Sequence, residues 1–105
     1  MEKIKKIWGS ETTWTQSQNY VSSFLLINPG YRISKNKFSI QEQSLYVQEG
    51  GLLVWLSKKE NDIIFIRPGT SYYIPEKKFY RYGAPVEQGF PTSLIKIGVF
   101  KKSIV

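Results

Sequence analysis

The sequence contains no histidine and no cysteine. Without cysteine it has no disulfide scaffold, no thiolate-ligated zinc site and no thiol nucleophile. Without histidine it lacks the commonest metal ligand and the usual acid–base residue, which excludes Ser-His-Asp and Cys-His catalysis. Long apolar runs are also missing: nothing approaches the ~18 consecutive apolar residues of a transmembrane helix, and no apolar stretch follows the charged N-terminus. We therefore expect no membrane association and a cytoplasmic location.

Acidic residues are scarce, with 8 Asp and Glu against 15 Lys and Arg, and the formal net charge is +7. A basic protein attracts polyanions such as nucleic acids. The lysines are nevertheless dispersed in short clusters, at positions 3, 5 and 6, 35 and 37, 58 and 59, 77 and 78, and 101 and 102. This dispersal favours solvated lysines at turns and termini over a single nucleic-acid groove.

Short runs of β-branched and aromatic residues, separated by Gly, Pro and Asn, dominate the rest of the sequence. They predict strands at 20–27, 44–48, 52–56, 62–66, 71–74, 78–82 and 93–100. Gly50-Gly51 predicts a tight hairpin, and 57–62 predicts a second hairpin loop. Helical periodicity beyond two turns is absent. The 105 residues suit one domain, and the pattern predicts an all-β sandwich or barrel.

Two stretches show a spacing that resembles a known family. The first, at 30–50, contains Gly30, Asn36, Phe38, Gln43 and Gly50, and the second, at 69–84, contains Gly69, Pro75, Lys77 and Tyr80. Their intervals resemble the two cupin motifs, G-x5-H-x-H-x(3,4)-E-x6-G and G-x5-P-x-G-x2-H-x3-N. The flanking segments WGSE, NPGYRIS and YVQEG resemble the single-domain cupins related to type II mannose-6-phosphate isomerase.

The resemblance implies that residues 1–105 form one cupin domain. The fold would be a double-stranded β-helix, which is a jelly-roll barrel of two antiparallel sheets. It also implies a homodimer formed by pairing sheets.

The resemblance also identifies where a metal would be held. In metal-binding cupins the two His and the Glu of the first motif and the His of the second converge on one divalent ion. This sequence has Asn36, Phe38, Gln43 and Tyr80 at those positions. Divalent transition metals prefer imidazole, thiolate or carboxylate ligands. We therefore expect no metal and no cofactor.

Strand alternation extends these positions to a candidate pocket. If Gln43 points into the barrel, Leu45 does so too, and Tyr80 shares a face with Tyr82. The predicted pocket contains Asn36, Phe38, Gln43, Leu45, Tyr80 and Tyr82. Amides and phenols hydrogen-bond sugar hydroxyls, and aromatic rings stack on sugar C–H faces. The same large side chains would alternatively fill the barrel as packing.

Three functional hypotheses follow from the sequence. The first is a metal-free, non-catalytic cupin-like protein that binds a small polar ligand, such as a sugar or sugar phosphate, in the barrel. The alternative is a sugar-phosphate or nucleotide-sugar isomerase or epimerase of the mannose-6-phosphate isomerase type, which would work without histidine. Tyr80 is its candidate catalytic residue. The third is a basic polyanion-binding domain.

Overall fold

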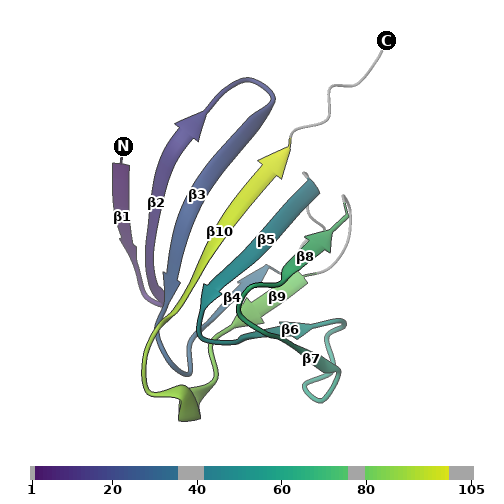
Figure 1. Ribbon diagram of the computed structural model, residues 1–105. Coiled ribbons are helices and arrows are strands. Elements are labelled where there is room, and N and C mark those ends of the chain that lie inside the picture. The colour runs from purple at the N-terminus through teal and green to yellow at the C-terminus, as the bar shows by residue number, and fades with distance from the viewer. Residues whose placement is uncertain (1, 36–41, 76–79, 100–105) are drawn as a thin grey trace.

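The computed structural model describes residues 2–35, 42–75 and 80–99, which are mostly β-strand (Figure 1). Every strand pair is antiparallel. The elements are β1 (Glu2–Lys6), β2 (Gly9–Gln16), β3 (Tyr20–Ile27), β4 (Arg32–Lys35), β5 (Glu42–Glu49), β6 (Leu52–Trp55), β7 (Ile63–Ile66), β8 (Ser71–Ile74), β9 (Tyr80–Gly83), the 3-10 helix η1 (Val86–Gln88) and β10 (Thr92–Val99). The predicted all-β class is confirmed.

The strands form two sheets. The six-stranded sheet has the order β1-β2-β3-β10-β5-β8, and the four-stranded sheet has the order β4-β9-β6-β7. The long strands of the first sheet run side by side in Figure 1, with β10 between β3 and β5. This is the two-sheet jelly roll expected from the sequence. No helix in the described ranges is long and apolar enough to cross a membrane.

Burial alternates along β5 as expected for a strand with one face toward the core. Gln43, Leu45 and Val47 are buried, whereas Ser44 and Tyr46 are exposed. We call the face that carries Gln43 and Leu45 the inner face of the six-stranded sheet, and the opposite face its outer face. The hydrophobic core contains Leu25, Ile27, Leu45, Val47, Leu52, Val54, Ile66, Ile74, Tyr82, Ala84 and Leu94.

Three strands were not predicted from the sequence: β1, β2 and β4. β2 consists of Gly, Ser, Glu, Thr, Trp and Gln, and β1 is exposed at every position. Their hydrogen bonds come from neighbours, because β2 pairs with both β1 and β3. Strand formation here depends on long-range pairing more than on local hydrophobic alternation.

The predicted hairpin at Gly50-Gly51 is wrong. β5 belongs to the six-stranded sheet and β6 to the four-stranded sheet, so the strands on either side of the glycines do not pair. The chain instead crosses between the sheets, with Gly50 at φ +78°. Side chains near β10 fix the crossing: Gly51 N–H donates to Gln88 Oε1 at 2.7 Å, and Thr92 Oγ1 donates to the Gly51 carbonyl at 2.6 Å. The second predicted hairpin, between β6 and β7, is present.

Candidate functional site

The structure describes the side chains of Gln43, Leu45 and Tyr82 from the predicted pocket. Gln43 and Leu45 lie on the inner face of β5, with exposed fractions of 3% and 0%. Tyr82 lies on β9, in the other sheet, and is 1% exposed. Asn36, Phe38 and the side chain of Tyr80 lie outside the described residues, so their part in the pocket stays a prediction. The alternation that placed Gln43 and Leu45 on one buried face is confirmed.

Tyr82 belongs to the hydrophobic core between the sheets. It pairs with Ile33 of β4 and Val54 of β6, and Val54 is itself buried. It is one of the largest fully buried side chains in the described chain. The ring therefore packs with aliphatic neighbours, which is the packing alternative that the sequence left open.

A row of polar residues crosses the inner face beside Leu45. Thr13 of β2 pairs with Ser23 of β3, Ser23 pairs with Lys96 of β10, and Lys96 pairs with Leu45. Ser23 is completely buried, and its hydroxyl lies 3.2 Å from Thr13 Oγ1. Residues paired across antiparallel strands share a face, so these groups lie on the same wall as Gln43.

Lys96, a member of this row, forms an ion pair with Glu11. Lys96 Nζ is 3.3 Å from Glu11 Oε2, and the two side chains are only 17% and 22% exposed. A lysine ammonium has three protons to donate. Within the described ranges, the Lys96 ammonium donates to the Glu11 carboxylate. The ammonium therefore has donor capacity left for another oxygen.

Gln43 completes this set. It pairs with Gly98, two residues after Lys96, so Gln43 and Lys96 are diagonal neighbours on adjacent strands. Gly98 itself is buried. We call Glu11, Thr13, Ser23, Gln43 and Lys96 the inner polar wall. The sequence analysis identified only Gln43, because Glu11 and Lys96 are 85 positions apart and neither belongs to a motif.

The described residues do not fit a cupin-type metal centre. Gln43 offers a neutral amide where the family pattern has a carboxylate, and the chain has no histidine or cysteine. No group of three or more Asp or Glu side chains comes together in the described ranges. A neutral amide compensates poorly for the dehydration of a divalent transition metal. The expected absence of a metal stays a prediction.

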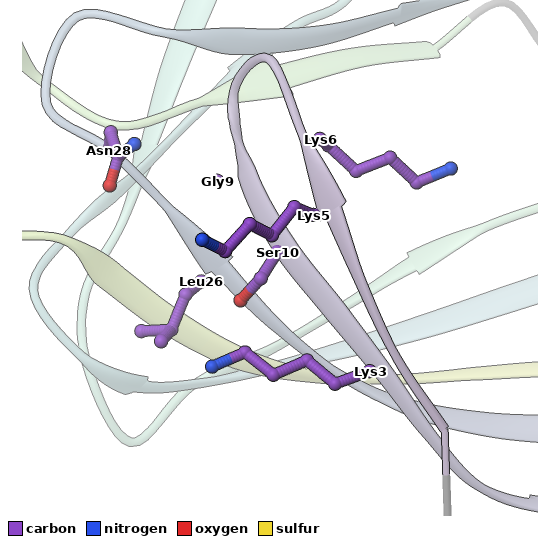
Figure 2. Close-up of a pocket in the computed structure, with 7 residues that line it drawn as sticks. All are labelled: Lys3, Lys5, Lys6, Gly9, Ser10, Leu26 and Asn28. Atoms are coloured by element: carbon purple, nitrogen blue, oxygen red, sulfur yellow. The ribbon is translucent and has the colours of Figure 1, made fainter.

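A second polar surface lies on the outer face, at the β1 edge. A pocket of about 330 Å³ is lined there by Lys3, Lys5, Lys6, Gly9, Ser10, Leu26 and Asn28. Figure 2 shows Lys3 and Lys5 extending in the same direction, on the side of Ser10 and Leu26, whereas Lys6 points away. These lysines are exposed as expected, but they lie on a strand rather than in a turn.

The four-stranded sheet has a cluster of charges on its outer face. Glu60 accepts hydrogen bonds from Arg32 Nη1 at 3.0 Å and Arg81 Nη1 at 3.2 Å. The Arg32 guanidinium also lies 5.0 Å from the centre of the Trp55 ring. The hydrogen bond from Arg32, with the positive charge of both arginines, lowers the pKa of Glu60. These charges are paired with one another, and they connect the loop between β6 and β7 to β4 and β9.

No protein-family model matches the sequence, and neither does any curated protein sequence. Solved structures do match. An RmlC-like cupin family protein with a double-stranded β-helix fold, from Methanocaldococcus jannaschii, is 10% identical with a TM-score of 0.72, covering 93% of this chain and 80% of that one. KdgF from Halomonas sp. is 13% identical with a TM-score of 0.78, covering 97% and 90%. The polyketide cyclase RemF from Streptomyces resistomycificus is 14% identical with a TM-score of 0.73, covering 90% and 67%.

The chain has the cupin double-stranded β-helix fold. Identities of this size establish the fold alone, and one of these structures is described as a cyclase while another is described only by its family. One fold commonly supports unrelated activities, so the function of this chain must be argued from its own side chains.

Proposed function

We propose that the barrel interior binds a small polar ligand, such as a sugar or sugar phosphate. The observation that carries the proposal is the inner polar wall, which borders a hydrophobic core of aliphatic and aromatic side chains. Its side chains come from four strands, β2, β3, β5 and β10, of the same sheet. A ligand on the inner face would contact the partly exposed members, Glu11, Thr13 and Lys96, whereas Ser23 and Gln43 lie buried behind them.

The energetics support a binding role for the wall. Burying an ammonium and a carboxylate costs free energy before their attraction is counted, and an apolar pair of similar volume is often as stable or more so. Burying the neutral hydroxyl of Ser23 and the amide of Gln43 also costs free energy, although less than burying a charge. A ligand that uses these groups gives a reason for keeping them.

The chemistry of the wall suits a hydroxylated ligand with a negative charge. Thr13, Ser23 and Gln43 can each donate and accept hydrogen bonds, as sugar hydroxyls do. Lys96 supplies a positive charge with free donor capacity, which suits a phosphate oxygen. Glu11 holds the ammonium in place and accepts from a hydroxyl. The ligand class is therefore a monosaccharide or its phosphate.

The Lys96→Met substitution tests this proposal. Methionine is unbranched like lysine and one atom shorter, so it keeps most of the packing but removes the ammonium. Mannose 6-phosphate should therefore bind at least about tenfold more weakly, the effect of losing one charged hydrogen bond. Mannose itself should be affected less. Isothermal titration calorimetry on both proteins measures the difference, with Lys58→Met, in the exposed β6–β7 loop, as the matched control.

Two results would overturn the proposal. One is that the unmodified protein binds neither mannose nor mannose 6-phosphate at millimolar concentration. The other is that Lys96→Met and Lys58→Met have the same effect on binding. Circular dichroism of each variant establishes that the fold is retained.

The Glu11–Lys96 pair also favours the second candidate, a sugar isomerase that works without histidine. A carboxylate can remove the proton from the carbon beside the carbonyl of the open-chain sugar and return it to the former carbonyl carbon, while the hydroxyl proton passes from the one oxygen to the other. The ammonium stabilises the negative charge on oxygen between these transfers. Glu11→Gln keeps the size and should abolish interconversion of mannose 6-phosphate and fructose 6-phosphate, with binding largely retained. Nuclear magnetic resonance of the sugar mixture follows the reaction. Absence of turnover in the unmodified protein would contradict this second candidate.

A further inference from the structure

We propose that the pocket at the β1 edge of the six-stranded sheet binds the phosphate group of a small phosphate monoester. The pocket has a volume of about 330 Å³, which lies within the range of small-molecule sites. It lies on the outer face of the sheet, whereas the proposed sugar site lies on the inner face. The inference is therefore independent of the proposed function.

Lys3 and Lys5 supply two positive charges on the same side of β1. They are two residues apart on one strand, so their side chains share a face. Figure 2 shows both extending on the side of Ser10 and Leu26, with Lys6 pointing away. Each ammonium has three protons to donate. Two such groups match a phosphate monoester, which carries between about 1.5 and 2 negative charges at pH 7.

The Ser10 hydroxyl is a buried polar group in the same pocket. Ser10 pairs with Lys5 across β2 and β1, and it is only 8% exposed. Among the described residues its hydroxyl has no hydrogen-bond partner. Figure 2 shows its oxygen on the same side as the nitrogens of Lys3 and Lys5. Burying a hydroxyl without a partner costs free energy, and a phosphate oxygen in the pocket would accept the missing hydrogen bond.

The two lysines are not neutralised by carboxylates of the chain. The described residues that line the pocket include no Asp or Glu, and no ion pair of Lys3 or Lys5 is present in the described ranges. Lys96 on the inner face differs, because it is paired with Glu11. Lys3 and Lys5 therefore attract an anion from solution without having to release a partner.

The rest of the pocket suits a small organic group beside the phosphate. Leu26 is half-buried and offers an apolar contact, and the exposed Asn28 has an amide that can donate and accept hydrogen bonds. A nucleic acid is a poorer match, because each of its phosphodiester groups carries a single charge and tight binding requires many cations in a row. The ligand class is therefore a small phosphate monoester.

A nuclear magnetic resonance titration of the isotope-labelled protein tests the proposal. Methyl phosphate and dimethyl phosphate are a matched pair of probes, because the second methyl group removes one of the two negative charges. Methyl phosphate should shift the backbone amide signals of Lys5, Ser10 and Leu26. Dimethyl phosphate should bind at least about tenfold more weakly. The amide signal of Lys96 reports any binding at the inner polar wall separately, so the two sites are distinguished.

Three variants test the contacts. Lys5→Gln removes one ammonium and should weaken the binding of methyl phosphate at least about tenfold. Ser10→Ala removes the hydroxyl but keeps both lysines, and it should weaken binding about threefold or more. Lys6→Gln is the matched control, because it removes the same charge from the next position of β1, where the side chain points away (Figure 2). It should leave the dissociation constant unchanged. The amide spectrum of each variant verifies that the fold is retained.

Each contrary result contradicts the proposal. If the signals of Lys5 and Ser10 do not shift at high millimolar methyl phosphate, the pocket binds no phosphate monoester. Equal losses for Lys5→Gln and Lys6→Gln mean that the net charge of the chain attracts the anion without a specific site. Equal affinities for the two probes mean that the second negative charge is not recognised. A single-stranded oligonucleotide that shifts the same signals at lower concentration than methyl phosphate would identify a nucleic-acid surface instead.

Discussion

Replacing Tyr82 by alanine should lower the free energy of unfolding by about 3–5 kcal/mol, the usual cost of deleting a fully buried aromatic side chain. Tyr82 is 1% exposed and belongs to the core cluster between the two sheets. Removing the ring would leave a large cavity next to Ile33 and Val54, the residues with which Tyr82 pairs on the adjacent strands. Urea denaturation followed by tryptophan fluorescence measures the change.

Tyr31→Ala is the control for this prediction. Tyr31 is 47% exposed, and its truncation should cost less than about 1 kcal/mol. If Tyr82→Ala is as stable as Tyr31→Ala but loses ligand binding, Tyr82 is a binding residue, as the sequence analysis proposed, and its packing role is secondary. A large loss of stability identifies it as a core residue.

Gly9→Ala should destabilise the protein by about 3 kcal/mol or more. A Cβ at Gly9 would lie 1.8 Å from the backbone carbonyl oxygen of Leu26, and the residue has φ +153°. The clash is with backbone of the neighbouring strand β3, which cannot move without disturbing the pairing of β2 with β3. Both the close approach and the backbone conformation therefore require glycine. Thermal unfolding should show a lower midpoint.

Gly69→Ala separates the effect of the steric clash from the effect of the backbone conformation. Gly69 also has positive φ, at +85°, but a Cβ there would meet nothing within 4 Å. It should cost only the about 1–2 kcal/mol of placing an L side chain in that backbone region. Equal losses for Gly9→Ala and Gly69→Ala would show that the close approach to Leu26 is relieved elsewhere.

The sequence predicted the fold well where strands are apolar. The 20–27 run is rich in Val, Phe, Leu and Ile, and its predicted bounds match β3. β1 and β2 were missed because they contain few large apolar residues and show no apolar–polar alternation, and their pairing comes from other segments. Gly50-Gly51 was misassigned for a related reason: glycines mark a turn but do not indicate whether the next strand stays in the same sheet.

The candidate site was predicted only in part. Alternation along β5 correctly placed Gln43 and Leu45 on one buried face, because the local period determines which side chains share a face, whereas their role in a pocket stays a prediction. It gave no sign of the ion pair, since Glu11 and Lys96 meet only after β2, β3 and β10 align. Glu11 and Lys96 belong to different strands, so the pattern within either strand does not indicate that they are partners. Identifying the pair requires the register in which the strands align.

The central position of β10 has a consequence for how the chain is made. β10 lies between β3 and β5, yet the ribosome synthesises it after the other nine described strands. Tyr20, at the start of β3, cannot meet its partner Val99 until then. Two strand edges stay open during most of synthesis, and open edges recruit other chains. Folding should therefore be late and slow, with the nascent chain most prone to aggregate just before residues 92–99 emerge.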